Sequence, residues 1–173
     1  LLSELFDFHK FDYVYHLAAQ INLRKSITHP DVDAETNILG SLAIIKKCID
    51  YKIKKIIFSS TGGAIYNANG ELPYDEYSDA NPSSPYGLSK LTVERYLDIM
   101  KNLKGLDYVA LRYSNVFGPR QNAHGEAGVI SIFKDKALKG EDMVINGDGS
   151  QTRDFIYVDD VVAANLLAQN LSG

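Results

Sequence analysis

The stretch Lys55-Ile56-Ile57-Phe58-Ser59-Ser60-Thr61-Gly62-Gly63 decides the fold class of this 173-residue chain. Its first residues form a nearly continuous apolar run, which is typical of a parallel strand covered on both faces. Its last residues are small and polar, as expected where a strand ends and the chain leaves the sheet. The apolar and aromatic runs at 11–17 and 107–113 predict two further strands of the same kind.

The segments between these predicted strands carry apolar residues at helical spacing. They recur every three or four positions in residues 33–51 and again in 86–103, where Ser83 or Ser84 can cap the helix. Alternating strands and helices predict an α/β fold, a doubly wound parallel sheet with right-handed crossovers. Ligands bind such sheets beyond the carboxyl ends of the strands. The polar and small residues at 16–20, 59–66 and 112–118 therefore predict a site at that edge.

The second half of the chain predicts shorter elements. Residues 114–127 are rich in Gly, Asn and charged residues, and they predict a loop. The elements expected after this loop are a helix at 129–138, short strands at 143–145 and 155–158, and a last helix capped by Asp159 or Asp160.

The composition argues against several classes of protein. The chain is 45% hydrophobic and 23% charged, which is enough apolar material for a folded core. Its net charge of −4 lacks the basic surplus of a nucleic-acid binder, and no apolar run approaches the ~20 residues needed to cross a membrane. The single cysteine, Cys48, fits a reducing compartment, so we expect a cytoplasmic protein.

Other potentially reactive residues predict packing or solvent roles. The histidines have no metal-ligand spacing with one another, so no metal site is expected. His16 lies in a predicted strand and Cys48 in a predicted helix, and both are expected to pack in the core. Lys52, Lys54 and Lys55 are expected to form a solvated helix end.

Tyr86 and Lys90 stand four positions apart near the start of a predicted helix, which places both side chains on one face. A lysine ammonium beside a phenol favours the phenolate and lowers its pKa. Tyr86 is therefore a candidate general base near neutral pH. The spacing alone is a weak signal, because Tyr51 and Lys55 repeat it across a predicted helix end and strand start.

Several motifs together resemble a known family. The segments Tyr86-Gly87-Leu88-Ser89-Lys90, Ser59-Ser60-Thr61 and His16-Leu17-Ala18-Ala19-Gln20 resemble those of extended short-chain dehydrogenase/reductases. The later segments at 111–121 and 147–160 resemble the NAD-dependent epimerase/dehydratase family, and within it the UDP-glucose 4-epimerases most closely. The motifs occur in the family's order from about residue 11 to residue 170.

The resemblance implies a role for each matching residue. Tyr86 would be the general base, Lys90 would lower its pKa and hold the nicotinamide ribose, and Thr61 would hydrogen-bond the sugar 4-hydroxyl. The residues implied to bind NAD are Leu17, Ala18, Ala19, Asn37, Ser59, Tyr86, Lys90 and Tyr113. The residues implied to bind the substrate are Thr61, Asn115, Val129 and Arg153.

The implied reaction inverts C4 of a UDP-hexose, UDP-glucose or UDP-galactose, through a 4-keto intermediate with tightly bound NAD. Dehydratases of the family add an acidic residue after the Ser/Thr, whereas this chain has Gly62 and Gly63, which favours an epimerase. A UDP-N-acetylglucosamine 4-epimerase, a related dehydratase or reductase, and a non-catalytic binding protein on the same fold remain alternatives. Arg112 is equally open as a ligand contact or a structural ion pair.

The Gly-x-Gly-x-x-Gly loop that opens a Rossmann fold is missing. The resemblance places this loop upstream, so we expect an internal fragment: a Rossmann-like domain truncated at its N-terminal side, with part of a small C-terminal substrate lobe. Residues 1–117 would form the partial NAD-binding domain, and 118–173 would begin the substrate-binding region and add a returning strand and helix. The fragment alone is expected to be inactive, and the full-length protein is expected to be a homodimer that binds a UDP-sugar but neither nucleic acid nor membrane.

Overall fold

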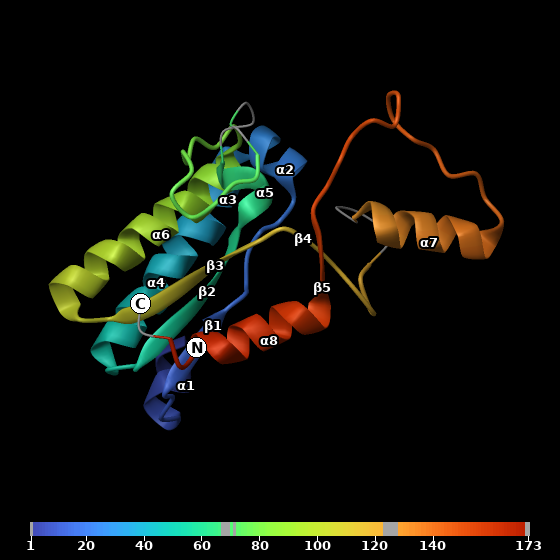
Figure 1. Ribbon diagram of the computed structural model, residues 1–173. Helices are drawn as coiled ribbons and strands as arrows, with labels where there is room; N and C mark the ends of the chain where they lie inside the picture. The colour runs from blue at the N-terminus through green and yellow to red at the C-terminus, as the bar shows by residue number, and fades with distance from the viewer. Residues whose placement is uncertain (1, 67–69, 71, 123–127, 172–173) are drawn as a thin grey trace.

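The computed structural model describes residues 2–66, 70, 72–122 and 128–171. Figure 1 shows the elements in chain order. The strands are β1 (Tyr13–His16), β2 (Lys55–Thr61), β3 (Asp107–Tyr113), β4 (Asn115–Phe117) and β5 (Phe155–Tyr157). The helices are α1 (Leu2–Phe8), α2 (Leu23–Thr28), α3 (Pro30–Ala34), η1 (Glu35–Leu39), α4 (Gly40–Asp50), α5 (Gly62–Ile65), α6 (Pro85–Lys104), α7 (Val129–Lys139) and α8 (Val158–Ala168).

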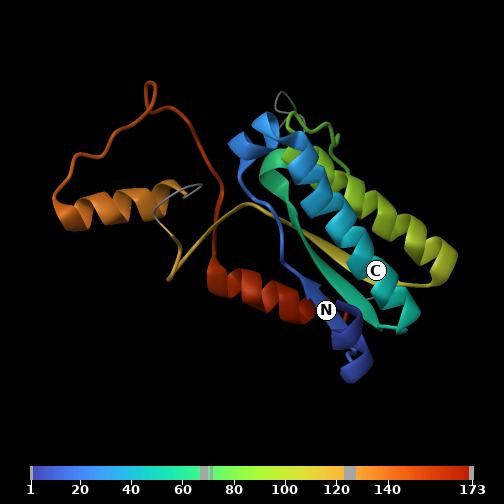
Figure 2. The ribbon, with the colours of Figure 1, turned by 180° about the vertical axis from the view of Figure 1, so that it is seen from behind.

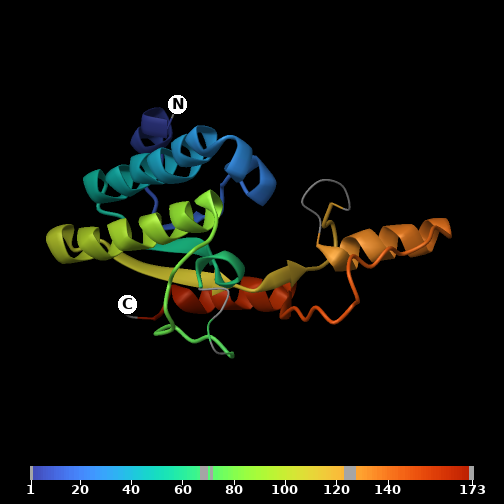
Figure 3. The same cartoon turned by 90° about the horizontal axis from the view of Figure 1, so that it is seen from above.

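The main sheet is parallel, in the order β1-β2-β3, as the apolar runs predict. Viewed from above, α4 and α6 cover one face and α8 covers the other (Figure 3). This three-layer arrangement confirms the predicted α/β class. Because the strands are parallel, His16, Thr61 and Tyr113 all lie at the same edge of the sheet.

The core lies between the sheet and the helices α4 and α6. Its buried apolar side chains form one hydrophobic cluster. The members contributed by these elements are Ile45, Cys48, Ile56, Phe58, Val93 and Leu97. Cys48 is fully buried, as predicted, and burial raises the pKa of its thiol to about 12.

The first predicted helix is longer than residues 33–51. It begins at Pro30, runs through α3, widens to a π-helical turn in η1 and continues as α4. Pro30 occupies the first position of α3, where the missing N–H would have no helical partner. The π-turn carries Asn37, which lies buried beneath the carboxyl end of β1 and is bonded to Gln20. π-Bulges often occur at functional sites.

Helix α6 has the cap that the sequence predicts. The Ser84 hydroxyl accepts from the Gly87 N–H at 3.1 Å, and Pro85 takes the first helical position. The helix ends at Gly105, whose φ of 70° is the left-handed conformation that favours glycine. These signals fix where Tyr86 and Lys90 enter the helix.

The chain after β3 departs from the prediction in three places. Residues 115–117 form β4, which pairs with β5 in parallel, so the segment 114–127 is not all loop. Residues 143–145 form no strand and are exposed, because no neighbouring strand supplies hydrogen bonds. The last helix begins at Val158 with Tyr157 at its N-cap, so neither Asp159 nor Asp160 caps it. Figure 2 shows α7 and the chain that follows it extending away from the three-layer body.

Lys55 is buried, which corrects the prediction of a solvated lysine. Its ammonium donates to the carbonyl oxygens of Ala168 at 3.2 Å, Gln169 at 3.0 Å and Leu171. It also lies 3.3 Å from the carboxylate of Asp107. This one side chain therefore joins the starts of β2 and β3 to the end of α8.

Candidate active site

Thr61, Tyr86 and Lys90 lie at the carboxyl edge of the sheet. Thr61 is the last residue of β2, while Tyr86 and Lys90 occupy the first two turns of α6. The Lys90 Nζ is 6.0 Å from the centre of the Tyr86 ring, which confirms that the two side chains share a face. The structure thus brings a phenol and an ammonium together beside the end of a parallel strand.

Gly87 lets α6 approach α5 closely enough to hold Tyr86 at this edge. A Cβ at position 87 would overlap the carbonyl oxygen of Ala64 and press on the Pro82 side chain at 3.0 Å. A Cβ at Gly62 would lie 3.2 Å from the Arg112 carbonyl oxygen, which is also tight. Packing therefore requires glycine at position 87, whereas a side chain at position 62 would be tight against β3.

Lys90 is buried, with 4% of its surface exposed. Its ammonium donates to the Ser59 carbonyl oxygen at 2.7 Å and lies 4.8 Å from the centre of the Phe58 ring. Burial lowers the pKa of Lys90 to about 8, against the opposing charges of Asp33 and Glu94. Lys90 therefore stays protonated at neutral pH with a small margin.

Tyr86 does not have the lowered pKa that its spacing from Lys90 predicts. Burial raises the pKa of the phenol, and the negative charge of Asp33 raises it further. The expectation considered only Lys90 and omitted burial and Asp33. In the chain by itself, Tyr86 is therefore a neutral phenol at pH 7.

A buried polar network lies directly beneath this pair, and the sequence analysis missed most of it. The Asp33 carboxylate accepts from the Ser89 hydroxyl at 2.6 Å, from Gln20 Nε2 at 2.9 Å and from Asn37 Nδ2 at 3.0 Å. Asn37 also bonds both backbone groups of Gln20, at 2.8 and 2.9 Å. Asp33 and Asn37 stand four positions apart on an otherwise apolar helix face, and that spacing was a usable signal.

His16 continues the network into β1. Ser41 gives its hydroxyl hydrogen to the Asn37 carbonyl oxygen, so the His16 Nε2–H donates to the Ser41 oxygen at 2.8 Å. Burial lowers the pKa of His16 to about 4, and the charge of Lys90 contributes. His16 is therefore a neutral, hydrogen-bonded core residue, as predicted.

The residues expected to bind NAD fall into two groups. Leu17 and Ala18 are exposed directly after β1, with Leu17 at 60%, so they offer an open apolar surface. Asn37 and Tyr113 are already bonded, Asn37 within the network and Tyr113 through its hydroxyl, which accepts from Asn165 at 2.6 Å. These two fit a supporting role better than a direct polar contact.

Ser59 supplies a second indication of ligand binding at this edge. Its hydroxyl oxygen is buried and has no hydrogen-bond partner within the described part of the chain. Buried polar groups are normally paired, so this unpaired hydroxyl fits a polar ligand at the carboxyl end of β2, where the Ser59 carbonyl oxygen accepts from Lys90. Together with the Lys90 ammonium and the open surface at Leu17, Ser59 fits the ribose end of a nicotinamide cofactor.

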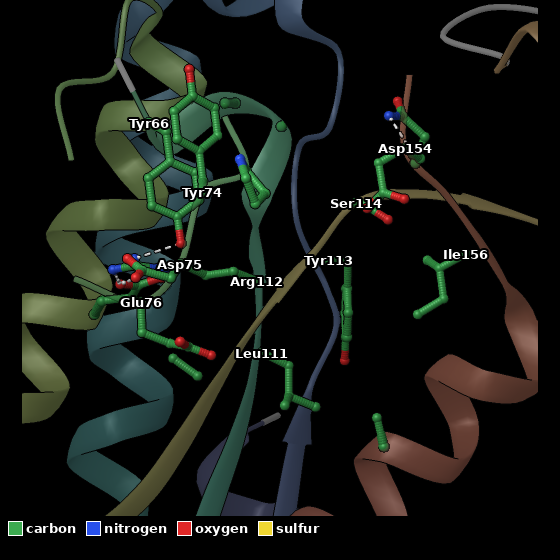
Figure 4. Close-up of a pocket in the computed structure, with 18 of the residues that line it drawn as sticks. Tyr66, Tyr74, Asp75, Glu76, Leu111, Arg112, Tyr113, Ser114, Asp154 and Ile156 are labelled. Carbon is green, nitrogen blue, oxygen red and sulfur yellow. Dashed lines mark hydrogen bonds and ion pairs between the residues drawn. The ribbon is translucent and has the colours of Figure 1, made fainter. Parts of the chain in front are cut away.

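The substrate residues expected from the sequence are only partly brought together. Asn115 donates through both its backbone and its side chain to the Asp154 carbonyl oxygen, at 3.0 and 2.9 Å, so it lies next to Arg153. Both line an open cleft of about 1610 Å³ beside β3 and β5, and Tyr113 lies on the wall of the same cleft (Figure 4). Val129 begins α7 and is not among the described residues that line this cleft.

Arg112 forms a structural ion pair. Its guanidinium binds both carboxylate oxygens of Glu94, the closest at 2.6 Å, and donates to the Tyr66 hydroxyl at 3.1 Å. Figure 4 shows Arg112 turned to one side of β3 and Tyr113 to the other, as alternation along a strand requires. Among the described residues, the Arg153 guanidinium forms no such ion pair and donates to the neighbouring Thr152 carbonyl oxygen at 2.6 Å.

Two other kinds of feature are absent from the described part of the chain. No cluster of three or more metal-ligating side chains occurs there. No helix there combines the length and the apolar character needed to cross a membrane.

Comparisons with known proteins identify the family of the chain. Residues 1–171 match the NAD dependent epimerase/dehydratase family. A putative UDP-glucose 4-epimerase of Methanocaldococcus jannaschii is 51% identical over 98% of this chain and 55% of its own length. The solved structure of a Thermotoga maritima UDP-glucose 4-epimerase with UDP-glucose is 50% identical with a TM-score of 0.94, over 96% of this chain and 54% of that one.

A third comparison concerns the substrate. A Methanobrevibacter ruminantium UDP-N-acetylglucosamine 4-epimerase, solved with UDP-N-acetylmuramic acid, is 45% identical with a TM-score of 0.89. The match covers 92% of this chain and 51% of that one. The chain thus spans about half the length of the relatives that it matches. The chain belongs to the NAD-dependent epimerase/dehydratase family.

Proposed function

We propose that the protein carrying this chain is an NAD-dependent nucleotide-sugar 4-epimerase that acts on a UDP-hexose, UDP-glucose or UDP-galactose. The observation that carries the proposal is the shared face of Tyr86 and Lys90 at the carboxyl end of β2, where the Lys90 ammonium donates to the Ser59 carbonyl oxygen. The Ser59 hydroxyl is buried there without a partner among the described residues. The relatives named UDP-glucose 4-epimerase support this choice of reaction.

In this proposal the chain positions the sugar and moves one proton. When bound, NAD would supply reversible hydride transfer at C4, by which a 4-keto sugar forms and is reduced on its opposite face. Tyr86 acts as the phenolate in the filled site: its oxygen takes the 4-hydroxyl proton, which makes it a neutral phenol, and gives that proton back after the sugar has turned. Thr61 holds the same hydroxyl, and Lys90 and Ser59 hold the ribose of the cofactor. Leu17, Ala18 and Ala19 line the cofactor cleft.

Substrate binding is proposed at the cleft beside β3. Asn115 would hold the diphosphate, Arg153 would pair with a phosphate as a bidentate donor, and Val129 would approach the uracil. Asn37 and Tyr113 would support the cofactor side. We place the partial NAD-binding domain at 1–117 and the start of the substrate-binding region at 118–173.

Elimination chemistry fits the site less well. A dehydratase needs an acid next to the Ser/Thr, and packing leaves little room for a side chain at Gly62, where the nearest carbonyl oxygen is 3.2 Å from an added Cβ. A hydride shuttle without elimination requires no such acid. The intact Thr61, Tyr86 and Lys90 also argue against a non-catalytic binding protein.

The proposal is tested by incubating the full-length protein with UDP-glucose and, separately, with UDP-N-acetylglucosamine. We expect epimerised UDP-glucose without net formation of NADH, and loss of turnover in Tyr86→Phe with unchanged circular dichroism. A fully active Tyr86→Phe variant would remove Tyr86 from the mechanism. Epimerisation of UDP-N-acetylglucosamine but not of UDP-glucose would favour a UDP-N-acetylglucosamine 4-epimerase. The Methanobrevibacter ruminantium structure at 45% identity supports this alternative.

Two further expectations belong to the same proposal. The 173-residue chain by itself should neither bind NAD tightly nor turn over substrate, and titration with NAD tests this directly. The full-length protein should be a homodimer through α4 and α6, since α6 exposes Leu88 and Leu103 at 55% and 69%. Sedimentation velocity that shows only monomer would exclude the dimer.

A further inference from the structure

Asp33 is the most deeply buried charged side chain near Tyr86 and Lys90. It has no exposed surface, and its two carboxylate oxygens accept three hydrogen bonds from other elements. One of these bonds comes from Ser89, which lies on α6 between Tyr86 and Lys90. Asp33 therefore contacts the catalytic helix at the very turn that carries the proposed proton-transfer pair.

Hydrogen bonds alone do not neutralise a buried carboxylate. The ion pairs formed by the described residues do not include Asp33. A buried charge without a partner is strongly unfavourable, so its nearest opposite charge has a large effect on it. Lys90 directly follows Ser89 on α6 and is itself buried, and the charge of Asp33 favours its protonated form.

We propose that Asp33 is a positioning residue that supplies the buried counter-charge of Lys90 and ties the start of α6 to the loop after β1. The proposal rests on the proposed function, in which Tyr86 and Lys90 carry the chemistry. The second part of the role is geometric. The Asp33 Oδ1 atom accepts from Gln20 while Oδ2 accepts from Ser89, so one carboxylate joins the cofactor-side loop to the catalytic helix.

The charge of Asp33 changes the pKa values of Lys90 and Tyr86 in the same direction. The charge of Asp33 raises the pKa of Lys90, which burial lowers to about 8, and it also raises the pKa of Tyr86. The other titratable groups that face this region are Glu94 on α6 and His16 on β1. The cations of the packed helix α2, Arg24 and Lys25, are exposed to solvent. Removal of the Asp33 charge therefore moves the titration of both Lys90 and Tyr86 to lower pH.

The test compares two substitutions in the full-length, cofactor-free protein. Asp33→Asn removes the charge and keeps the shape, whereas Ser89→Ala removes the hydrogen bond and keeps the charge. Lys90 is followed by NMR of ¹³Cε-labelled lysine and assigned by its absence in Lys90→Met. We expect the pKa of Lys90 to fall by roughly one unit in Asp33→Asn and to stay unchanged in Ser89→Ala.

Two results would overturn the proposal. The first is an unchanged Lys90 titration in a folded Asp33→Asn variant. The second is an equal shift in both variants, which would mean that local packing rather than charge controls Lys90. If Asp33→Asn alone fails to fold, the double variant Asp33→Asn/Lys90→Met decides the question. Recovery of cooperative unfolding in the double variant supports the charge pair, and failure to recover overturns it.

Turnover gives a separate readout. In a loaded, active enzyme, Asp33→Asn should shift both limbs of the kcat/KM profile to lower pH, whereas a purely structural role would only lower its height. The NMR titration needs no substrate, so a wrong choice of substrate or reaction leaves it unaffected. The two failures are therefore distinguishable.

Discussion

The role of Arg112 can be settled by its removal. Arg112→Met deletes three contacts with the Glu94 carboxylate and one with the Tyr66 hydroxyl. It also removes the guanidinium that lies 5.2 Å from the centre of the Tyr66 ring. Among the described residues, Glu94 would then keep the bond from the Ser60 hydroxyl alone, and its side chain is 9% exposed. The variant therefore creates a buried carboxylate with most of its partners gone.

The loss of stability expected in Arg112→Met follows from the burial of the Arg112–Glu94 ion pair. Removing one partner of a buried ion pair costs about 3–5 kcal/mol, because the remaining charge is left unpaired. The Arg112 side chain is 20% exposed, so water reaches part of the pair and we expect the lower end, about 3 kcal/mol. The double variant Arg112→Met/Glu94→Gln no longer buries a bare charge. Its loss in free energy of unfolding should be smaller, by about 1–2 kcal/mol, than the summed losses of the two single variants.

The assay is urea unfolding of the full-length protein followed by circular dichroism, with Arg95→Met as a matched control. Arg95 is exposed on the same helix, so its replacement should change the free energy of unfolding by less than about 0.5 kcal/mol. A loss below about 1 kcal/mol in Arg112→Met, together with a raised KM for the UDP-sugar, would refute the structural role. It would reassign Arg112 to the substrate.

Two other perturbations test the structure at a distance from Tyr86. Lys55→Met should destabilise the fold by about 2–4 kcal/mol in urea unfolding. It leaves Asp107 and three carbonyl oxygens at the end of α8 without their shared donor. An unchanged free energy of unfolding would contradict this role of Lys55. His16 should make stability fall with acid: its folded pKa of about 4 lies below the unfolded 6.5, so the unfolded chain takes up a proton first as the pH drops from about 6.5 to about 4. The loss should be roughly 2 kcal/mol after allowance for partial solvent access, and His16→Gln should flatten the pH profile in that window; an unchanged slope would show that His16 is not its source.

The sequence predicts the sheet well because its signals are local. The apolar runs of β2 and β3, the helical spacing in α6, and the cap at Ser84 depend on neighbouring residues alone. The strand expected at 143–145 failed for the opposite reason. Those residues have strand-like side chains but no neighbouring strand to pair with, and pairing is a tertiary property. Strand β4, hidden in a polar segment, forms because β5 returns beside it.

The same distinction applies to the site. The Tyr86–Lys90 face follows from spacing, and so could be predicted. Lys55 and Arg112 each bind a partner on an element far away in the chain. The lysine-rich run around Lys55 and the isolated Arg112 therefore did not predict these contacts. Asp33 was missed because an acidic residue on a helix usually faces solvent, and only the packing of α3 against α6 and the loop after β1 buries it.

The balance of charges at Tyr86 limits what these residues can do by themselves. Burial and Asp33 raise the pKa of the phenol, and Lys90, whose own pKa is about 8, would lose its proton before Tyr86 does. The chain therefore cannot hold a phenolate and an ammonium together near neutral pH without a further positive charge that lies closer to the Tyr86 phenol than to the Lys90 ammonium. A phenol kept neutral until such charge arrives becomes a base only when the site is filled. If this is correct, Tyr86 should titrate at lower pH in the presence of NAD than in its absence, and an identical titration in both states would show that the chain alone sets the basicity of Tyr86.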